Sequence, residues 1–399
     1  MPEIMDKTNT AIPNIALFNL GFRVFFLGAT VYSIVTILFW MGIFAFNMPL
    51  PLSGLSTFQW HAHEMIFGYA MAVIAGFLLT AVKNWTGIQT VHGIPLAFIF
   101  CLWLIARLLF LFGSTFIHIA AIFDLLFILS VIVAAAYPIF KAKNWRQLGI
   151  LSKLVLLAFA NVCFYLGFIG WLEQGLYWGV YGGLYLVIGL ILTLGGRVIP
   201  FFIQGGVEKS VQLYNPKWIT LLGLVIFLVF FISELFLHDK NITGITSVAL
   251  CILYSVRLVG WYTSGIWKKP LLWSLYLAML FIVIGFLLFA FSVYAGIPKY
   301  LAIHALAYGG IGVMTMSMMA RVSLGHTGRN INEPPEMVKY MLAMLIAGTV
   351  IRVFLPMIAP DSYLIWIISS QLFWLIAFIM FLIAYAPILI KPRFDAQFG

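Results

Sequence analysis

Charged side chains are scarce in this 399-residue sequence, which has 12 Asp and Glu against 22 Lys and Arg, or 9% in all. A soluble domain carries about 25% charged residues, whereas this chain is 64% hydrophobic and has a mean hydropathy of +1.09. So few charges cannot make a hydrated surface for the whole chain. This excludes a soluble enzyme and a protein that binds nucleic acid. The apolar runs are too long and too uniform for the alternating strands of an outer-membrane barrel.

Cysteine is also rare, with three residues that are far apart and lie within apolar runs: Cys101, Cys163 and Cys251. No CxxC or CxxCH pattern is present, which argues against covalently attached haem and against a cysteine-ligated zinc ion. A disulfide-stabilised secreted scaffold is excluded as well. The first 19 residues are polar and of mixed charge, and they lack the pattern of a secretory signal.

The sequence is instead rich in apolar runs long enough to cross a bilayer, which requires about 20 residues. These runs lie near 20–46, 60–83, 93–113, 116–140, 147–170, 176–200, 217–236, 242–263, 270–294, 299–322, 337–359 and 363–390. We therefore predict an all-α fold, a polytopic transmembrane helix bundle with about twelve spans. Residues 1–399 are expected to form a single integral membrane domain.

The positions of Lys and Arg predict the orientation, because cytoplasmic loops carry an excess of these residues. With the N-terminus inside, only Lys240 and Lys299 fall outside. The basic residues that then fall on the cytoplasmic side are Lys7, Arg23, Lys83, Lys141, Lys143, Arg146, Lys209, Lys217, Lys268, Lys269, Arg329, Lys339, Lys391 and Arg393. Both termini are therefore predicted to be cytoplasmic, and the net charge of +10 reflects this bias.

Ionisable residues within a membrane are costly and mark candidate functional sites. The densest group opens the second span, with His61, His63 and Glu64 at its outer end. Residues two apart on a helix point in different directions, so His61 and His63 are not expected to bind one ion together. His61 and Glu64 are three apart and are expected to share a side of the helix.

Small residues follow this group at four-residue spacing, as Gly68, Ala72 and Gly76. Such a stripe allows another helix to approach closely. We expect the side of the helix that carries Glu64 to be packed against protein.

The tenth span also begins at the outer face and carries His304 near its start. Imidazole is the usual protein ligand of haem iron and also suits copper. His304 together with His61 or His63 is therefore a candidate pair of axial ligands for a non-covalent b-type haem. The alternative is that these histidines are hydrogen-bonded polar residues at the membrane interface.

The same span carries Met314, Met316, Met318 and Met319. Thioethers favour Cu(I), but methionines more often fill gaps in a core. They lie too far along the helix from His304 to share its metal ion.

Arg107 and Asp124 lie on the third and fourth spans, which a short turn makes antiparallel neighbours. A buried ion pair between them is the expected arrangement. Its role is either structural or part of a path for protons or electrons.

A second polar group is predicted at the cytoplasmic face, where Arg197, Arg321 and His326 end their spans. His304 and His326 are 22 residues apart in one helix, roughly 33 Å, and so belong to opposite faces. The two arginines either extend to lipid headgroups or pair with the propionates of a cofactor or with a quinone head.

Several segments resemble the NnrS family, membrane proteins of bacterial nitric-oxide metabolism that contain haem and copper. The resemblance covers the whole chain in the expected order. It is carried by Phe22-Arg23-Val24-Phe25-Phe26-Leu27-Gly28, by Trp60-His61-Ala62-His63-Glu64-Met65 through Gly68 and Ala75-Gly76-Phe77-Leu78-Leu79-Thr80-Ala81-Val82 to Asn84-Trp85-Thr86-Gly87, by Gly196-Arg197-Val198-Ile199-Pro200-Phe201-Phe202, by His304-Ala305-Leu306, and by Arg321-Val322 with Gly325-His326-Thr327-Gly328-Arg329.

The resemblance implies a protein of the bacterial inner membrane that acts in denitrification or in defence against nitrosative stress. It implies haem b and copper as cofactors, nitric oxide as the small molecule handled, and an electron donor such as a quinol. Cofactor-binding roles are expected for His61, His63, His304, Arg197, Arg321 and His326.

Two main hypotheses follow from the sequence, beside a third in which the protein is a noncatalytic sensor or scaffold that holds haem without turning nitric oxide over. In the first, the protein is a haem-binding oxidoreductase or nitric-oxide-response protein, and Glu64 orients a ligating histidine or relays a proton as a catalytic residue. In the second, the protein is a secondary transporter that uses Glu64, Arg107 and Asp124 as coupling and substrate residues. The absorption spectrum of purified protein separates the two hypotheses.

Overall fold

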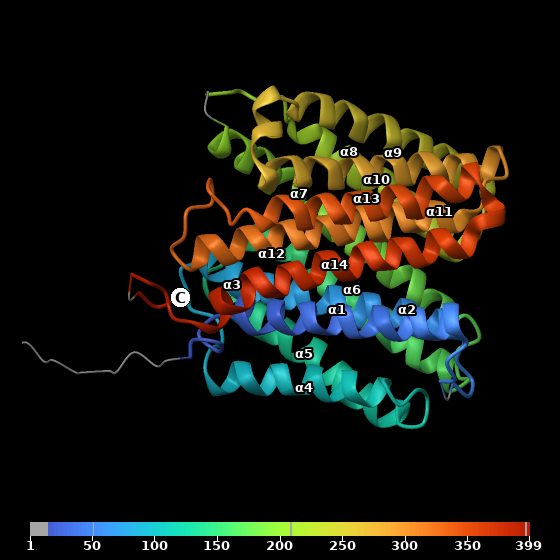
Figure 1. Ribbon diagram of the computed structural model, residues 1–399, viewed down its shortest axis with the longest axis horizontal. Helices are drawn as coiled ribbons and strands as arrows, with labels where there is room; N and C mark the ends of the chain where they lie inside the picture. The colour runs from blue at the N-terminus through green and yellow to red at the C-terminus, as the bar shows by residue number, and fades with distance from the viewer. Residues whose placement is uncertain (1–14, 51, 208–209, 396) are drawn as a thin grey trace, which may run out of the picture.

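The computed structural model describes residues 15–50, 52–207, 210–395 and 397–399, and this part of the chain is helical without a β-strand. Figure 1 shows long helices lying side by side. In the first half these are α1 (Gly21–Phe46), α2 (Thr57–His63), η1 (Glu64–Ala70), α3 (Met71–Thr86), α4 (Ile94–Phe110), α5 (Ile117–Lys141), η2 (Trp145–Gln147), α6 (Leu148–Phe168) and α7 (Gly175–Gly206). The second half contains α8 (Lys217–Ile232), η3 (Ser233–Leu237), α9 (Lys240–Trp261), η4 (Ser264–Lys268), α10 (Pro270–Tyr294), α11 (Lys299–His304), η5 (Ala305–Gly312), α12 (Val313–His326), α13 (Met337–Ile358), η6 (Pro360–Ser362) and α14 (Tyr363–Ile390).

Eleven helices of the described chain are long and apolar enough to cross a membrane. They match eleven of the twelve predicted spans. Several of them contain a short π-helical or 3₁₀-helical segment, as in the continuous helix Thr57–Thr86, which consists of α2, η1 and α3. The twelfth predicted span is α4, an apolar helix of 17 residues, which is at the lower limit for crossing a bilayer. Helices are the expected form because they satisfy their own backbone hydrogen bonds in hydrocarbon.

The two ends of the described chain meet at the same end of the bundle, since the Ala16 amide donates to the Ile390 carbonyl at 2.8 Å (Figure 1). We call the opposite end of the bundle the distal end. The membrane side on which each end lies stays a prediction from the charge distribution. Two residues used for that prediction, Lys7 and Lys209, lie outside the described part of the chain.

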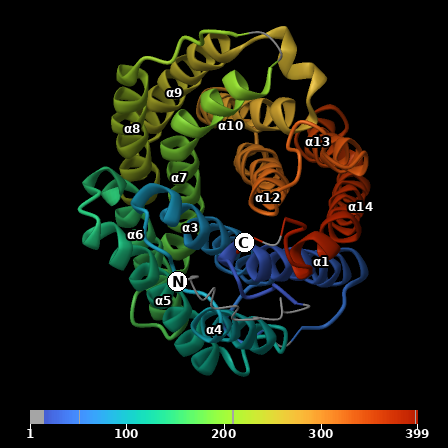
Figure 2. The same ribbon diagram turned by 90° about the vertical axis from the view of Figure 1, so that its left-hand side faces the viewer.

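Two spans run through the centre of the bundle, namely Thr57–Thr86 and Lys299–His326. They are the most buried of the eleven, with 89% and 78% of their apolar stretches inside the protein. Figure 2 shows α12 enclosed by the other helices, and its contacts extend to α1, α3, α10, α13 and α14. The fold therefore places the two histidine-bearing spans where side chains face protein and not lipid.

The small residues of the second span allow α1 to pack closely against it, as the sequence predicted. A methyl group added at Gly76 would lie 2.9 Å from the Phe26 ring and 3.0 Å from Phe25. One added at Gly68 would lie 2.7 Å from the Tyr32 ring and 3.1 Å from a guanidinium nitrogen of Arg107. Gly68 thus makes room for a charged side chain in the core.

Candidate functional site

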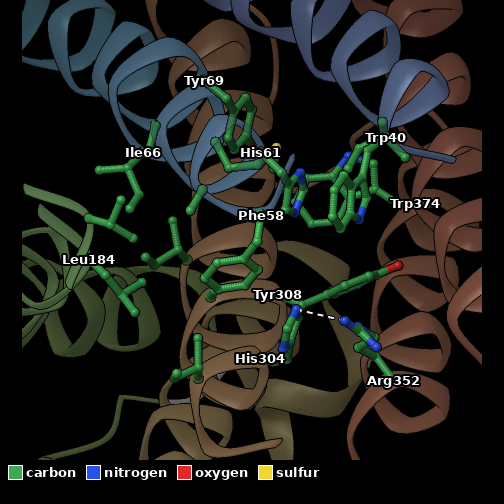
Figure 3. A pocket seen from close by; sticks show the side chains of 18 of the residues that line it. Trp40, Phe58, His61, Ile66, Tyr69, Leu184, His304, Tyr308, Arg352 and Trp374 are labelled. Carbon is green, nitrogen blue, oxygen red and sulfur yellow. Dashed lines mark hydrogen bonds between the residues drawn. The ribbon is translucent and has the colours of Figure 1, made fainter. Parts of the chain in front are cut away.

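A pocket lies in the distal half of the bundle, between the two central spans. Helices α1, α7, α13 and α14 complete its wall. The lining is mostly aliphatic and aromatic, with a few polar side chains that converge on the interior, as is usual for cofactor sites. Figure 3 shows His61 and His304 on opposite sides of this pocket.

The helix that carries His61 begins at a capping box. Ser56 Oγ accepts from the Gln59 amide at 3.1 Å, and Gln59 Oε1 accepts from the Ser56 amide at 2.9 Å. These reciprocal bonds fix the first turn of α2, and His61 follows in the next turn.

Both histidine-bearing spans change to a π-helix directly after their histidines. The segment η1 begins after His63, and η5 begins after His304. A π turn accommodates one extra residue and so rotates the following side chains by about 100° relative to a regular α-helix. Both segments form walls of the pocket, η1 through Ile66 and Tyr69 and η5 through Tyr308. Such insertions occur often at functional sites.

The ring of His304 is held in a defined tautomer. Its Nδ1 lies 2.7 Å from the Tyr300 carbonyl and therefore carries the proton that is donated there. Its Nε2 accepts a hydrogen bond from Arg352 Nη2 at 2.9 Å. A histidine that ligates a metal characteristically donates its other ring N–H, as His304 Nδ1 does to the Tyr300 carbonyl. Nε2 is therefore the nitrogen whose lone pair would coordinate a metal.

The ring of His61 stacks on Trp40, with centroids 4.4 Å apart and an angle of 9° between the planes. Its Nδ1 is buried and has no hydrogen-bond partner. A buried polar atom left unpaired is uncommon and calls for an explanation such as a bound ligand.

Two further pocket residues, Arg352 and Gln371, carry unpaired polar atoms. Arg352 is 8% exposed, and its Nη1 has no partner. Gln371 is 6% exposed, and neither atom of its amide has a partner. Neither residue was among the predicted site residues, although an arginine within an apolar span is itself a signal of a functional site.

His63 lies outside this pocket, in a second group of polar side chains that we call the buried ionic cluster. The cluster consists of Tyr32, His63, Glu64, Arg107, Asp124, Asn161 and Tyr165. His63 Nδ1 lies 2.7 Å from Glu64 Oε1, and its Nε2 lies 3.0 Å from Asn161 Oδ1. Since both ring nitrogens are engaged, His63 is not free to join His304.

Arg107 connects the two carboxylates of the cluster. It donates to Glu64 Oε1 at 2.7 Å and also to Asp124 Oδ1, so the predicted Arg107–Asp124 pair is confirmed. The remaining carboxylate oxygens accept from the Tyr32 hydroxyl and, at 2.8 and 2.9 Å, from Asn161 and Tyr165. All four carboxylate oxygens therefore have partners, as a buried ionic group requires.

His61 and Glu64 both face α1, as their three-residue spacing predicted, because His61 stacks on Trp40 and Glu64 accepts from the Tyr32 hydroxyl. Their further surroundings differ. His61 lines the pocket, whereas Glu64 also bonds to its neighbour His63 within the cluster.

The predicted polar group at the other end of the bundle does not reach the pocket. Arg197 is exposed, and the Arg321 guanidinium lies over the Phe202 ring at 3.9 Å from its centroid. The His326 ring lies 5.7 Å from the Phe22 ring, and its carbonyl accepts from Arg393. Arg393 also holds Asp395 at 2.6 Å, and this hydrogen bond lowers the pKa of Asp395 to about 2.

A second, apolar cavity lies next to the pocket, between the span Thr57–Thr86, α7 and the span Lys299–His326. Val73, Val187 and Met314 line it, each one turn beyond a pocket residue of its own span. Between the cavities the Tyr69 hydroxyl bonds to Thr315 Oγ1 at 2.7 Å. Met318 also lines the cavity.

The fold and the pocket define a polytopic helical membrane protein with a largely apolar, histidine-lined pocket between its helices. Residues 16–393 match the family described as NnrS protein, so the chain belongs to the NnrS family and is a membrane protein of the nitric-oxide response. No curated protein matches the chain.

Proposed function

We propose that the protein binds haem b in the distal pocket, where His61 and His304 would hold its iron. The proposal rests on one observation above all: two histidines from different helices face each other across a largely apolar pocket. His304 carries its N–H on the nitrogen remote from the pocket, and a nitrogen of His61 is unpaired. Stacked aromatic and aliphatic walls suit a flat apolar macrocycle.

Haem held in the pocket would supply a redox-active iron. The protein's own contribution is to hold the ring of each ligand. Trp40 stacks on His61, and the Tyr300 carbonyl fixes the tautomer of His304. Nitric oxide is small and uncharged, so it reaches the buried site through lipid without a polar channel.

A copper site has less support from the side chains. In the described part of the chain, no three residues among His, Cys, Asp and Glu are placed to hold a metal ion. Met314 and Met318 line the apolar cavity.

We assign Glu64 to the buried ionic cluster, where it orients His63 and not a haem ligand. The same cluster bears on the transporter hypothesis. Its Glu64, Arg107 and Asp124 satisfy one another, and their carboxylate oxygens are already bonded. The geometry therefore favours the haem hypothesis over ion-coupled transport.

The proposal is tested by absorption spectroscopy of the full-length protein purified in detergent after expression with ample haem. We expect a Soret band that weakens or shifts in His304→Ala and in His61→Ala. His326→Ala and His63→Gln are the controls, because these residues lie outside the pocket. A colourless wild-type protein, or a band unchanged by both pocket variants, would refute the proposal.

A further inference from the structure

Arg352 carries a positive charge into a pocket that does not neutralise it. Its side chain is 8% exposed, although it lies only six residues before the end of α13, close enough for a long side chain to reach the interface. Among the described residues that line the pocket, none is Asp or Glu. A buried charge without a counter-charge is unfavourable, so the pocket has the electrostatics of a site for an anion.

The hydrogen bonds around Arg352 also indicate an anion, because donor groups in the pocket lack acceptors. One guanidinium nitrogen donates to His304 Nε2, and Nη1 has no partner. The amide nitrogen of Gln371, another pocket residue, is also without a partner. A carboxylate, with two oxygens and no proton, is the group that such donors bind best.

The bond to His304 has a further consequence. The Nε2 atom has one lone pair, so Arg352 and a metal ion compete for it. Coordination of iron by His304 requires Arg352 to turn away and to find another acceptor. A carboxylate on the ligand supplies that acceptor in the same pocket.

We propose that Arg352, assisted by Gln371, binds a carboxylate of the pocket ligand, and that this contact releases His304 Nε2 for coordination. The ligand class is then a large apolar body that carries a carboxylate. Under the proposed function, on which this inference rests, that group is a haem propionate. Arg352 thus selects the ligand and prepares the site.

The experiment compares haem b with haem dimethyl ester, whose propionates are uncharged. Both are titrated into the full-length protein in detergent, and the Soret change gives the affinity of each. We expect the wild type to bind haem at least about tenfold more tightly than the ester, the factor that loss of a charge-assisted hydrogen bond produces. In Arg352→Met the preference should disappear, and Arg352→Lys should restore part of it.

Arg257→Met is a matched control, since Arg257 is also buried and incompletely paired but does not line the pocket. It should leave the preference for haem unchanged. Gln371→Leu, expected to reduce the preference about threefold, replaces Arg352→Met if that variant does not fold. Long-chain fatty acid in excess should displace haem only weakly. A fatty acid that binds as tightly as haem would show that the carboxylate of a lipid is the ligand.

The outcomes separate this inference from the proposed function. If neither porphyrin changes the spectrum of the wild type, the proposed function fails. If the wild type binds both with equal affinity, haem binding stands and the assignment of Arg352 is overturned.

Discussion

His61 and His63 are two residues apart, yet one faces a ligand pocket and the other a salt-bridged core. His61 stacks on Trp40 at the pocket wall, and His63 is fully buried between Glu64 and Asn161. The sequence showed that they cannot act together, because a helix turns about 200° over two residues. It did not show which one meets His304, since that depends on how the helix is rotated within the bundle.

At the same scale, Arg107 is expected to be essential for stability. Arg107→Met leaves the carboxylates of Glu64 and Asp124 buried without their cation, at a cost of about 3–5 kcal/mol. We expect a markedly lower melting temperature in detergent, measured by intrinsic fluorescence. The triple variant with Glu64→Gln and Asp124→Asn should recover much of the loss, because it removes the unpaired charges. An unchanged melting temperature in Arg107→Met would show that the cluster does not stabilise the fold.

At the scale of elements, the spans were predictable and the details that shape the site were not. Predicted runs at 299–322 and 60–83 correspond to the helices Lys299–His326 and Thr57–Thr86, because apolar length is written directly in the sequence. The π-helical segments η1 and η5 have no comparable signal, since they result from packing against neighbouring helices. The Arg352–His304 contact joins residues 48 positions apart and follows only from the packing of α11 against α13.

The contact between α1 and α3 gives an element-scale prediction. Gly76→Ala places a methyl group 2.9 Å from Phe26, and relief of that overlap should cost about 1–3 kcal/mol. The matched control is Gly205→Ala at the end of α7, where nothing lies within 4 Å of the added group. We expect a lower melting temperature for the first variant and an equal or higher one for the second. Equal effects would mean that the close approach of the two helices is not important.

At the scale of the whole molecule, the pocket and the apolar cavity form two compartments along one line through the bundle. Enclosed apolar cavities stay free of water and bind xenon. We expect xenon to bind in the cavity lined by Val187 and Met314, detected by 129Xe NMR of the detergent-solubilised protein.

Val187→Trp should fill this cavity and abolish the xenon signal, whereas Leu228→Trp at a 56% exposed position on α8 should not. Xenon binding that persists in Val187→Trp would place the gas elsewhere in the protein.

The Tyr69–Thr315 bond separates these two compartments and has a consequence for water. The walls of the apolar cavity, as far as the structure describes the chain, contain no free hydrogen-bonding group for water. The Thr315 hydroxyl, which lines it, is already bonded to Tyr69 and to the Ile311 carbonyl. Protons and ions follow continuous files of water, whereas dissolved gases do not need them. The bonded Tyr69 and Thr315 hydroxyls therefore mark the point between the pocket and the apolar cavity where polar partners for water end.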